Sequence, residues 1–458
     1  MNPVRFSRRA VLLGSAAAAL AGPALAQSDA SERLRRLFAR SDEAELRRNP
    51  LSALSRGDMR YAGKLGDLFT DSHDAAGRHN ALRDLNDLSK IDRSALSPDE
   101  QVAYDVFKWQ RDLDRRALSG ALLRADRAMA VNHFYGVHAS FAQLSSGQGS
   151  APFKTLGDYE NGLKRLRAMP AVFDRVGKRL RRGAREGMVL PRVIVNNVVE
   201  QLDAMVGPGV EASAFYTPIK AFPADIAPAD RARLAAAYGK VIGERLLPAL
   251  ARLRDYMRGE YLPQARDTVG LLHMKGGPEL YRFLVEAQTT TPMDPEEVHQ
   301  LGLSEVARIQ GEIRTVMTKV GFRGTLLEFF DHIRTDPKFK PTSKQQMIDG
   351  FTAIGARVAP NLPRLFGHLP RTRLEIRPTP ELTEKGAARG SYDSGTPDGS
   401  RPGVFYFNTY DLPSRSIPTM ETLYLHEGAP GHHFQISLAQ ENEALPAFMR
   451  FDLEASRR

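Results

Sequence analysis

The apolar residues of this chain recur mostly at the spacing of an α-helix. From Asp230 onward they fall largely on one helical face, at Leu234, Tyr238, Val241, Ile242, Leu250, Leu253 and Met257. The segments 97–118 and 159–180 have the same periodicity. This pattern predicts a mainly α protein.

Another helix is predicted to begin at Asp294. The aspartate can cap a helix, Pro295 suits the first helical position, and two glutamates follow in the first turn. The apolar residues beyond them are expected to form a buried stripe of Val298, Leu301, Val306, Ile309 and Ile313.

The period changes to that of strands after about Arg371. Residues 373–377 alternate between polar and apolar side chains, and residues 404–407 read Val-Phe-Tyr-Phe, a run rich in β-forming residues. The segment 390–402 between them has the composition of a polar loop. We therefore expect a short strand pair inside a helical protein.

The first 26 residues have the pattern of an export signal. Arg8 and Arg9 precede an apolar run over 10–21 that is too short to span a bilayer, and the small residues at 24–26 suit a signal peptidase. The pattern predicts a twin-arginine signal peptide over 1–26 and a periplasmic or otherwise exported protein. No stable membrane span should remain after signal removal, and a retained anchor is the alternative.

The composition excludes several classes of site and partner. The 458 residues contain no cysteine, which excludes disulfide scaffolds, cysteine nucleophiles and thiolate metal sites. The net charge is +10, but the densest basic run, 178–185, alternates with apolar residues at helical spacing. This run is typical of the solvated face of a helix, so we expect no nucleic-acid partner. Attraction to anionic membrane or wall polymers is the alternative interpretation.

Residues with metal-binding side chains cluster at one place. His426, His432 and His433 lie within eight residues, and Glu427 directly follows the first of them. A zinc hydrolase needs neutral imidazoles to hold the ion and a carboxylate to take a proton from the metal-activated water. The cluster therefore indicates a zinc cofactor (Zn²⁺). The alternative is a partly buried histidine cluster satisfied by hydrogen bonds.

The spacing of these histidines departs from the usual zinc-binding helix. In the HExxH pattern the second histidine follows the first by four residues, but Pro430 occupies that position here. On an unbroken helix His433 would lie about two turns, roughly 10 Å, from His426, which is too far for one ion. A local bulge at Pro430 and Gly431 would bring His432 to the metal instead.

This motif resembles the hallmark of a bacterial family, the domain of unknown function 885 family, which reads HE, two residues, then PGH. The resemblance extends over most of the chain to about Met449, with family-like segments at 159–187, 281–313, 336–339, 398–403 and 405–408. It implies a mainly α, helical zincin-like metallopeptidase fold with a small β-strand element beside the active-site helix.

The resemblance also implies roles for single residues. The family position that matches His432 belongs to the motif, whereas the one that matches His433 is often another residue. His426 and His432 are therefore expected to bind zinc, and Glu427 to act as the general base, with His433 as a further candidate ligand. The family pattern adds a glutamate in a later EGWA-like stretch, which is missing here; Glu454 is the candidate substitute. We expect the chain to be truncated at its C-terminus.

The strand region supplies three candidate substrate-binding residues. Arg401 can grip a substrate carboxylate, although packing beneath the glycine-rich loop is the more common role for such an arginine. Tyr406 can polarise the scissile carbonyl, although strand aromatics usually lie in the core. Asn408 ends the segment 404–408, which we expect to form a sheet edge along which an extended peptide substrate lies.

Together these features predict three parts of the chain. The signal peptide over 1–26 precedes a helical N-terminal region over 27–270 and a catalytic-like region over 271–458 that is incomplete at its C-terminus. The expected function is that of a zinc-dependent peptidase. The alternative is a truncated, non-catalytic periplasmic helical binding protein that retains the fold.

Overall fold

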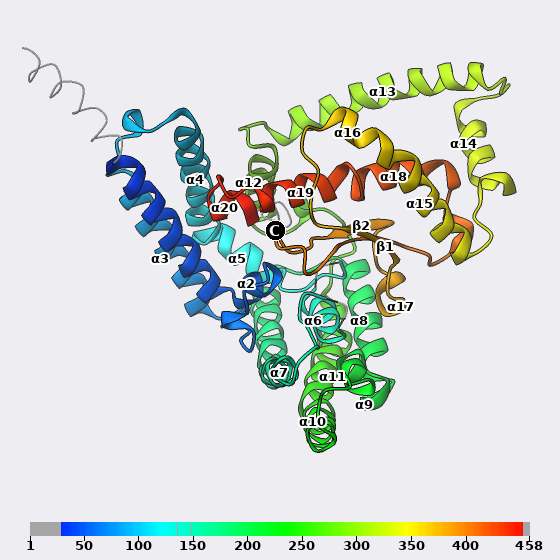
Figure 1. The fold of residues 1–458 in the computed structure, drawn as a ribbon. Coiled ribbons are helices and arrows are strands. Elements are labelled where there is room, and N and C mark those ends of the chain that lie inside the picture. Colours follow the sequence, from blue (N-terminus) through cyan, green and yellow to red (C-terminus); the bar gives the residue numbers. More distant parts are fainter. Residues whose placement is uncertain (1–28, 135, 148, 452–458) are drawn as a thin grey trace, which may run out of the picture.

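The computed structural model of the protein describes residues 29–134, 136–147 and 149–451. The predicted signal peptide and Glu454 lie outside these residues. The described chain is mainly helical and contains one small sheet (Figure 1), which confirms the prediction of a mainly α protein with a small β-strand element. None of its helices is both long enough and apolar enough to cross a membrane.

The first part of the chain contains helices alone. A helix over residues 29–48 is followed by α2 (Pro50–Ser55), α3 (Asp71–Leu88), α4 (Pro98–Ala117), α5 (Gly120–Ala128), α6 (Val137–Ser145), α7 (Leu156–Arg185), α8 (Arg192–Val206), α9 (Gly209–Ala212), α10 (Pro228–Val241) and α11 (Leu247–Tyr256). The second part contains α12 (Gly277–Thr289), α13 (Pro295–Lys319), α14 (Leu326–Thr335), α15 (Lys344–Val358), α16 (Leu362–Leu365), α17 (Glu381–Glu384), α18 (Met420–Glu427), α19 (Gly431–Glu441) and α20 (Ala447–Phe451), together with the strands β1 (Leu374–Pro378), β2 (Gly390–Asp393) and β3 (Gly403–Phe407).

Local sequence explains where the predicted helices begin. Ser97 caps α4 and forms a reciprocal capping box with Glu100, which satisfies two backbone N–H groups at the helix start. Thr155 and Asp158 do the same for α7. The helices predicted over 97–118 and 159–180 are confirmed.

Of the four hydrophobic cores in the described chain, two pack around the central helices and the sheet. The larger one lies among α7, α8, α10 and α11 and includes fully buried side chains such as Val172 and Leu250. The other lies between the sheet and helices α15, α18 and α19, where the ring of Phe351 meets those of Phe405 and Phe407 at 5.0 and 4.7 Å. This second core fixes α18 and α19 on one face of the sheet (Figure 1).

The last helix returns to the first. Phe448 of α20 packs against Phe38 and Phe107, with ring centroids 4.8 and 5.1 Å apart. The end of the described chain is therefore held against its N-terminal helices.

The sheet differs from the predicted strand pair. It has three strands in the order β1-β3-β2, with β1 parallel and β2 antiparallel to β3. The added strand, Gly390–Asp393, comes from the segment expected to be a loop. β3 is central and every one of its residues is buried. The prediction that 404–408 forms a sheet edge is therefore wrong, because both sides of this strand are already paired.

The buried stripe predicted on α13 is also wrong. The helix begins at Pro295 with the expected capping box from Asp294. However, Leu301, Val306 and Ile309 are exposed by 54%, 52% and 43%. Within the described residues Met317 alone is buried on this helix. In Figure 1 α13 spans from α12 to α14 at the periphery, so its apolar face finds no covering element there.

Candidate functional site

The histidine cluster lies where α18 ends and α19 begins. α18 ends at Glu427, the Ala429–Pro430 peptide is cis, and α19 begins at Gly431. The expected bulge within one helix is thus a break between two helices.

Gly431 allows the two helices to approach closely. A Cβ atom on Gly431 would lie 2.0 Å from the carbonyl oxygen of His426 and 2.4 Å from that of Leu425. No other residue type fits without moving the backbone, since real Cβ atoms do not come closer than about 3 Å to such atoms. The first turn of α19 therefore rests directly on the last turn of α18.

This approach places His426 and His432 side by side. Their ring centroids are 4.9 Å apart and the ring planes are nearly perpendicular, at 82°. His426 is exposed and His432 is half-buried. Both imidazoles are accessible from solvent and can converge on one small ligand or ion, which six residues of unbroken helix would not permit.

Glu427, the residue after His426, lies against the sheet. Its residue is only 8% exposed. A Cβ atom on Gly390 of β2 would lie 3.2 Å from the Cγ atom of Glu427 and 2.8 Å from the Cδ1 atom of Leu423. The glycine allows β2 to run directly beside the carboxylate residue.

His433 turns away from the other two histidines. It is 4% exposed, and its Nδ1 atom lies 3.0 Å from the hydroxyl of Tyr392. Burial lowers the pKa of His433 to about 4, against a hydrogen bond to the Thr372 backbone and the charge of Glu441, which act in the opposite direction. The imidazole is neutral at neutral pH and its Nδ1 atom is engaged by Tyr392, as expected of a histidine that supports the fold.

Arg401 is held by the N-terminal helices. One of its Nη2 hydrogens is donated to the carbonyl oxygen of Ser55, at the end of α2, over 2.5 Å. Its backbone N–H donates to the hydroxyl of Thr396, which in turn donates to Asp398. The hydrogen bond from the Thr396 hydroxyl, with those from the Ser400 backbone and side chain, lowers the pKa of Asp398 to about 2. The glycine-rich loop is thus a turn stabilised by hydrogen bonds among its own residues, and it fixes the position of Arg401.

Tyr406 and Asn408 are not brought to the histidines. Tyr406 is 5% exposed and alternates with Phe405 and Phe407, so its side chain lies on the sheet face opposite α18. The Asn408 amide donates to the carbonyls of Glu384 and Ala387 over 2.6 and 3.0 Å. Asn408 therefore holds the turn that leads into β2.

The position of β2 beside the site was not predicted from the sequence. Strand β2 lies at the edge of the sheet, beside Glu427, and reaches the N-terminal helices through a 2.9 Å hydrogen bond from Gln143 to Asp393. The alternation of Gly390, Ser391 and Tyr392 is a weak strand signal, which the turn residues that follow obscured.

The cluster supplies two of the ligands that zinc requires. Imidazole nitrogens suit zinc, and His426 and His432 are positioned to share an ion, but a protein zinc site takes three or four protein ligands. Over the described residues, no group of three or more His, Asp or Glu side chains is placed to hold a metal ion. The donor types fit zinc, and the ligand set is incomplete within these residues.

A solved structure and a family model each match most of this chain. A crystal structure of the putative lipoprotein from Colwellia psychrerythraea is similar, with a TM-score of 0.82 and 19% identity over 93% of this chain and 75% of that chain. No curated protein matches the chain. The model of a family described as bacterial protein of unknown function (DUF885) matches residues 50–455. Since this match spans most of the sequence, the chain belongs to the DUF885 family.

Proposed function

We propose that the protein is a zinc-dependent peptidase whose centre is the junction of α18 and α19. The observation that carries this proposal is the pairing of two accessible imidazoles, His426 and His432, at 4.9 Å directly beside the buried Glu427. Two neutral nitrogen donors next to one carboxylate are the residue types that metal-assisted hydrolysis needs.

In the proposed mechanism each side chain has a separate role. His426 and His432 hold the zinc ion, which supplies Lewis acidity when bound. Glu427 accepts the proton of the attacking water and delivers it to the leaving amine. Its burial excludes bulk water, which strengthens the electrostatic interactions that Glu427 makes during the reaction.

We propose that an extended peptide lies along β2 rather than β3. β2 has β3 on one side only, since it lies at the edge of the three-stranded sheet. An edge strand can pair with the backbone of a substrate. The approach of Gly390 to Glu427 would place such a peptide beside the general base.

We propose that a third zinc ligand lies outside residues 29–451, and Glu454 is its candidate in this sequence. Two ligands leave an ion largely to solvent, so loss of the third ligand should weaken zinc binding severely. Tight stoichiometric zinc that is lost in Glu454→Ala would assign Glu454 as the ligand, and zinc binding unchanged by Glu454→Ala would exclude it.

The incomplete ligand set also favours a second candidate function. The described residues alone would suit a non-catalytic binding protein that retains the fold. Zinc content after mild dialysis and hydrolysis of a mixed peptide library distinguish the two functions, since the binding protein would show neither.

The test of the proposed mechanism uses substitutions at the junction. Glu427→Gln should keep zinc and lose hydrolysis by about a hundredfold or more, the usual scale for a general base. Glu421→Gln, on the exposed side of the same helix, is the matched control. His426→Ala or His432→Ala should lower zinc occupancy more than His433→Ala does. Full activity in Glu427→Gln would refute the mechanism.

We propose that the protein is exported through its twin-arginine segment. The support is the sequence of residues 1–26, which lie outside the described part of the chain. Arg8→Lys with Arg9→Lys should retain the full-length precursor in the cytoplasm, as measured by fractionation and immunoblotting. Unchanged export would contradict this assignment.

A further inference from the structure

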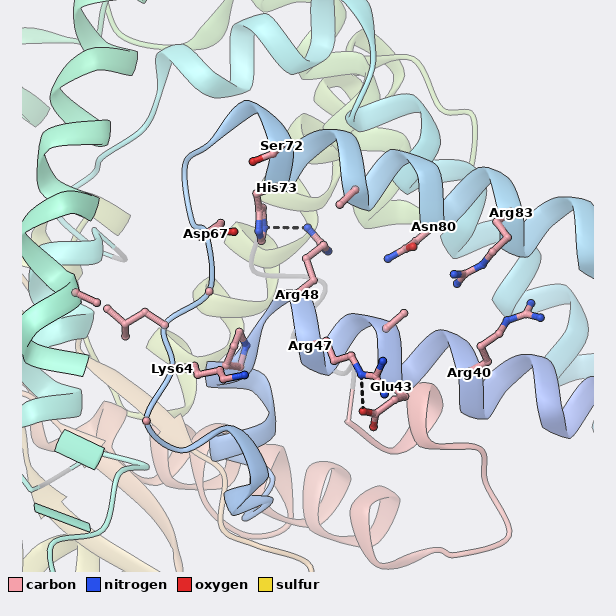
Figure 2. A pocket seen from close by; sticks show the side chains of 17 residues that line it. Arg40, Glu43, Arg47, Arg48, Lys64, Asp67, Ser72, His73, Asn80 and Arg83 are labelled. Atoms are coloured by element: carbon pink, nitrogen blue, oxygen red, sulfur yellow. Dashed lines mark hydrogen bonds and ion pairs between the residues drawn. The ribbon is translucent and has the colours of Figure 1, made fainter. Parts of the chain in front are cut away.

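A groove of about 920 Å³ lies between the helix over 29–48 and α3, well away in sequence from the histidine junction. Five basic side chains line it, against two acidic ones, Glu43 and Asp67. The basic residues are Arg40, Arg47, Arg48, Lys64 and Arg83. We refer to this site as the basic groove; Figure 2 shows its lining.

The two helices and the loop before α3, which carries Lys64, place basic residues at the ends of the groove. Figure 2 shows Arg40 and Arg83 near one another at one end, whereas Arg48 and Lys64 lie toward the other. Arg40 and Arg48 are eight residues apart on one helix, which corresponds to about 12 Å. Between the ends lie Ala44, Ala76 and Asn80, together with Arg47, which donates to Glu43 over 2.9 Å (Figure 2). The groove thus has basic side chains at both ends and an ion pair between them.

The first end contains more cations than carboxylates. Arg83 donates to Asp84 over 2.8 Å, and Asp84 is fully buried. Arg40 donates to Asp87 over 2.7 Å, and Asp87 also accepts from Lys90. Three cations therefore share two carboxylates. Each guanidinium has five N–H donors, so the ion pairs hold the arginines in place and leave donors for a ligand.

The second end of the groove also contains an arginine held in place by its neighbours. Arg48 is held by Glu45 and donates to the Nε2 atom of His73 over 2.9 Å, which requires an unprotonated Nε2. Lys64 is exposed and forms no ion pair with any carboxylate in the described residues. A fixed arginine and an unpaired lysine at one end are suited to an anionic group.

We propose that the basic groove binds an elongated ligand with an anionic group, carboxylate or phosphate, at each end. The volume suits a small molecule or short peptide of this kind. The separation of the charged ends, about 12 Å, matches a ligand three or four peptide units long. The site is separate from the zinc-peptidase proposal and stands or fails independently of it.

The test measures binding of two probes to the purified chain by isothermal titration calorimetry in 50 mM NaCl. A tetraglutamate peptide represents the carboxylate source, and the bisphosphate of octane-1,8-diol, whose phosphates can reach both ends of the groove, represents the phosphate source. We expect micromolar to submillimolar binding of at least one probe. We also expect binding to weaken in 500 mM NaCl, where charges are screened beyond about 4 Å. The probe that binds more tightly identifies the anionic group.

Two substitutions locate the binding to the groove. Lys64→Gln should weaken binding about fivefold or more, and Asn80→Asp should weaken it at least as much. Asn80 forms no side-chain hydrogen bond to another described residue, so the second change adds a negative charge without removing a contact. Lys240→Gln and Asn196→Asp are controls for the same charge changes on distant exposed sites.

Melting temperatures within about 2 °C of the parent should show that all four variants are folded. Absence of binding by both probes below 1 mM would overturn the proposal. So would binding that Lys64→Gln and Asn80→Asp reduce no more than their controls do.

Discussion

Replacing Gly431 by alanine should disrupt the junction between α18 and α19. The new Cβ atom would lie 2.0 Å from the carbonyl oxygen of His426 and 2.4 Å from its carbonyl carbon. Both are backbone atoms, so no side chain can rotate out of the way. The first turn of α19 must move by about 1 Å to restore ordinary contact distances.

The free-energy cost of this movement follows from the known effect of overpacking at other sites. Forcing one extra methyl group into a packed site destabilises a protein by about 1–3 kcal/mol. The same shift would separate His432 from His426, whereas metal–ligand distances tolerate about 0.2 Å. We expect Gly431→Ala to lower the free energy of unfolding by about 2 kcal/mol and zinc affinity by about tenfold or more.

The assay combines urea unfolding, followed by circular dichroism, with zinc titration in the presence of a competing chelator. Gly302→Ala is the matched control. Gly302 lies within α13, and an added Cβ there meets no atom within 4 Å. Helix propensity predicts that this control stabilises α13 by about 0.5–1 kcal/mol.

Unfolding of Gly431→Ala at the same urea concentration as the parent, with equal zinc affinity, would contradict this expectation. Loss of stability with unchanged zinc affinity would uncouple the two effects. In that case the close approach supports the fold but does not set the positions of the imidazoles.

Three further predictions concern other parts of the fold. Phe351→Ala removes a fully buried ring from the core beside the sheet and should lower the free energy of unfolding, measured in urea, by about 3–5 kcal/mol. Leu301→Ser on the exposed face of α13 should change it by less than about 0.5 kcal/mol. Gly390→Ala should lower peptide turnover while leaving zinc content unchanged, because the new methyl group contacts Glu427; equal turnover would contradict placement of substrate on β2. Burial lowers the pKa of His138 below its ordinary value near 6.5, so as the pH falls the unfolded chain binds a proton at this residue before the folded chain does. Stability should therefore fall as the pH drops below about 6.5. His138→Asn should reduce the slope of melting temperature against pH, and an unchanged slope would show that His138 does not cause it.

The helices could be predicted from local sequence alone. Ser97 with Glu100, and Thr155 with Asp158, satisfy helix starts within a few residues, and apolar residues at helical spacing supply the buried faces. Such interactions need no distant partner, so they can be read from the chain alone. The zinc-ligand candidates could be predicted for the same reason, because they lie close to one another in the sequence.

Which surfaces are covered and which side chains contact one another depends on the tertiary structure. The apolar stripe of α13 is a property of its sequence, but whether another element packs on it depends on the rest of the fold. The edge position of β2, the engagement of His433 by Tyr392 and the approach of Gly431 to His426 likewise depend on contacts that sequence spacing does not specify. Helix periodicity fixes the faces of an element, whereas packing of separate elements fixes their partners, and the function of a site depends on those partners.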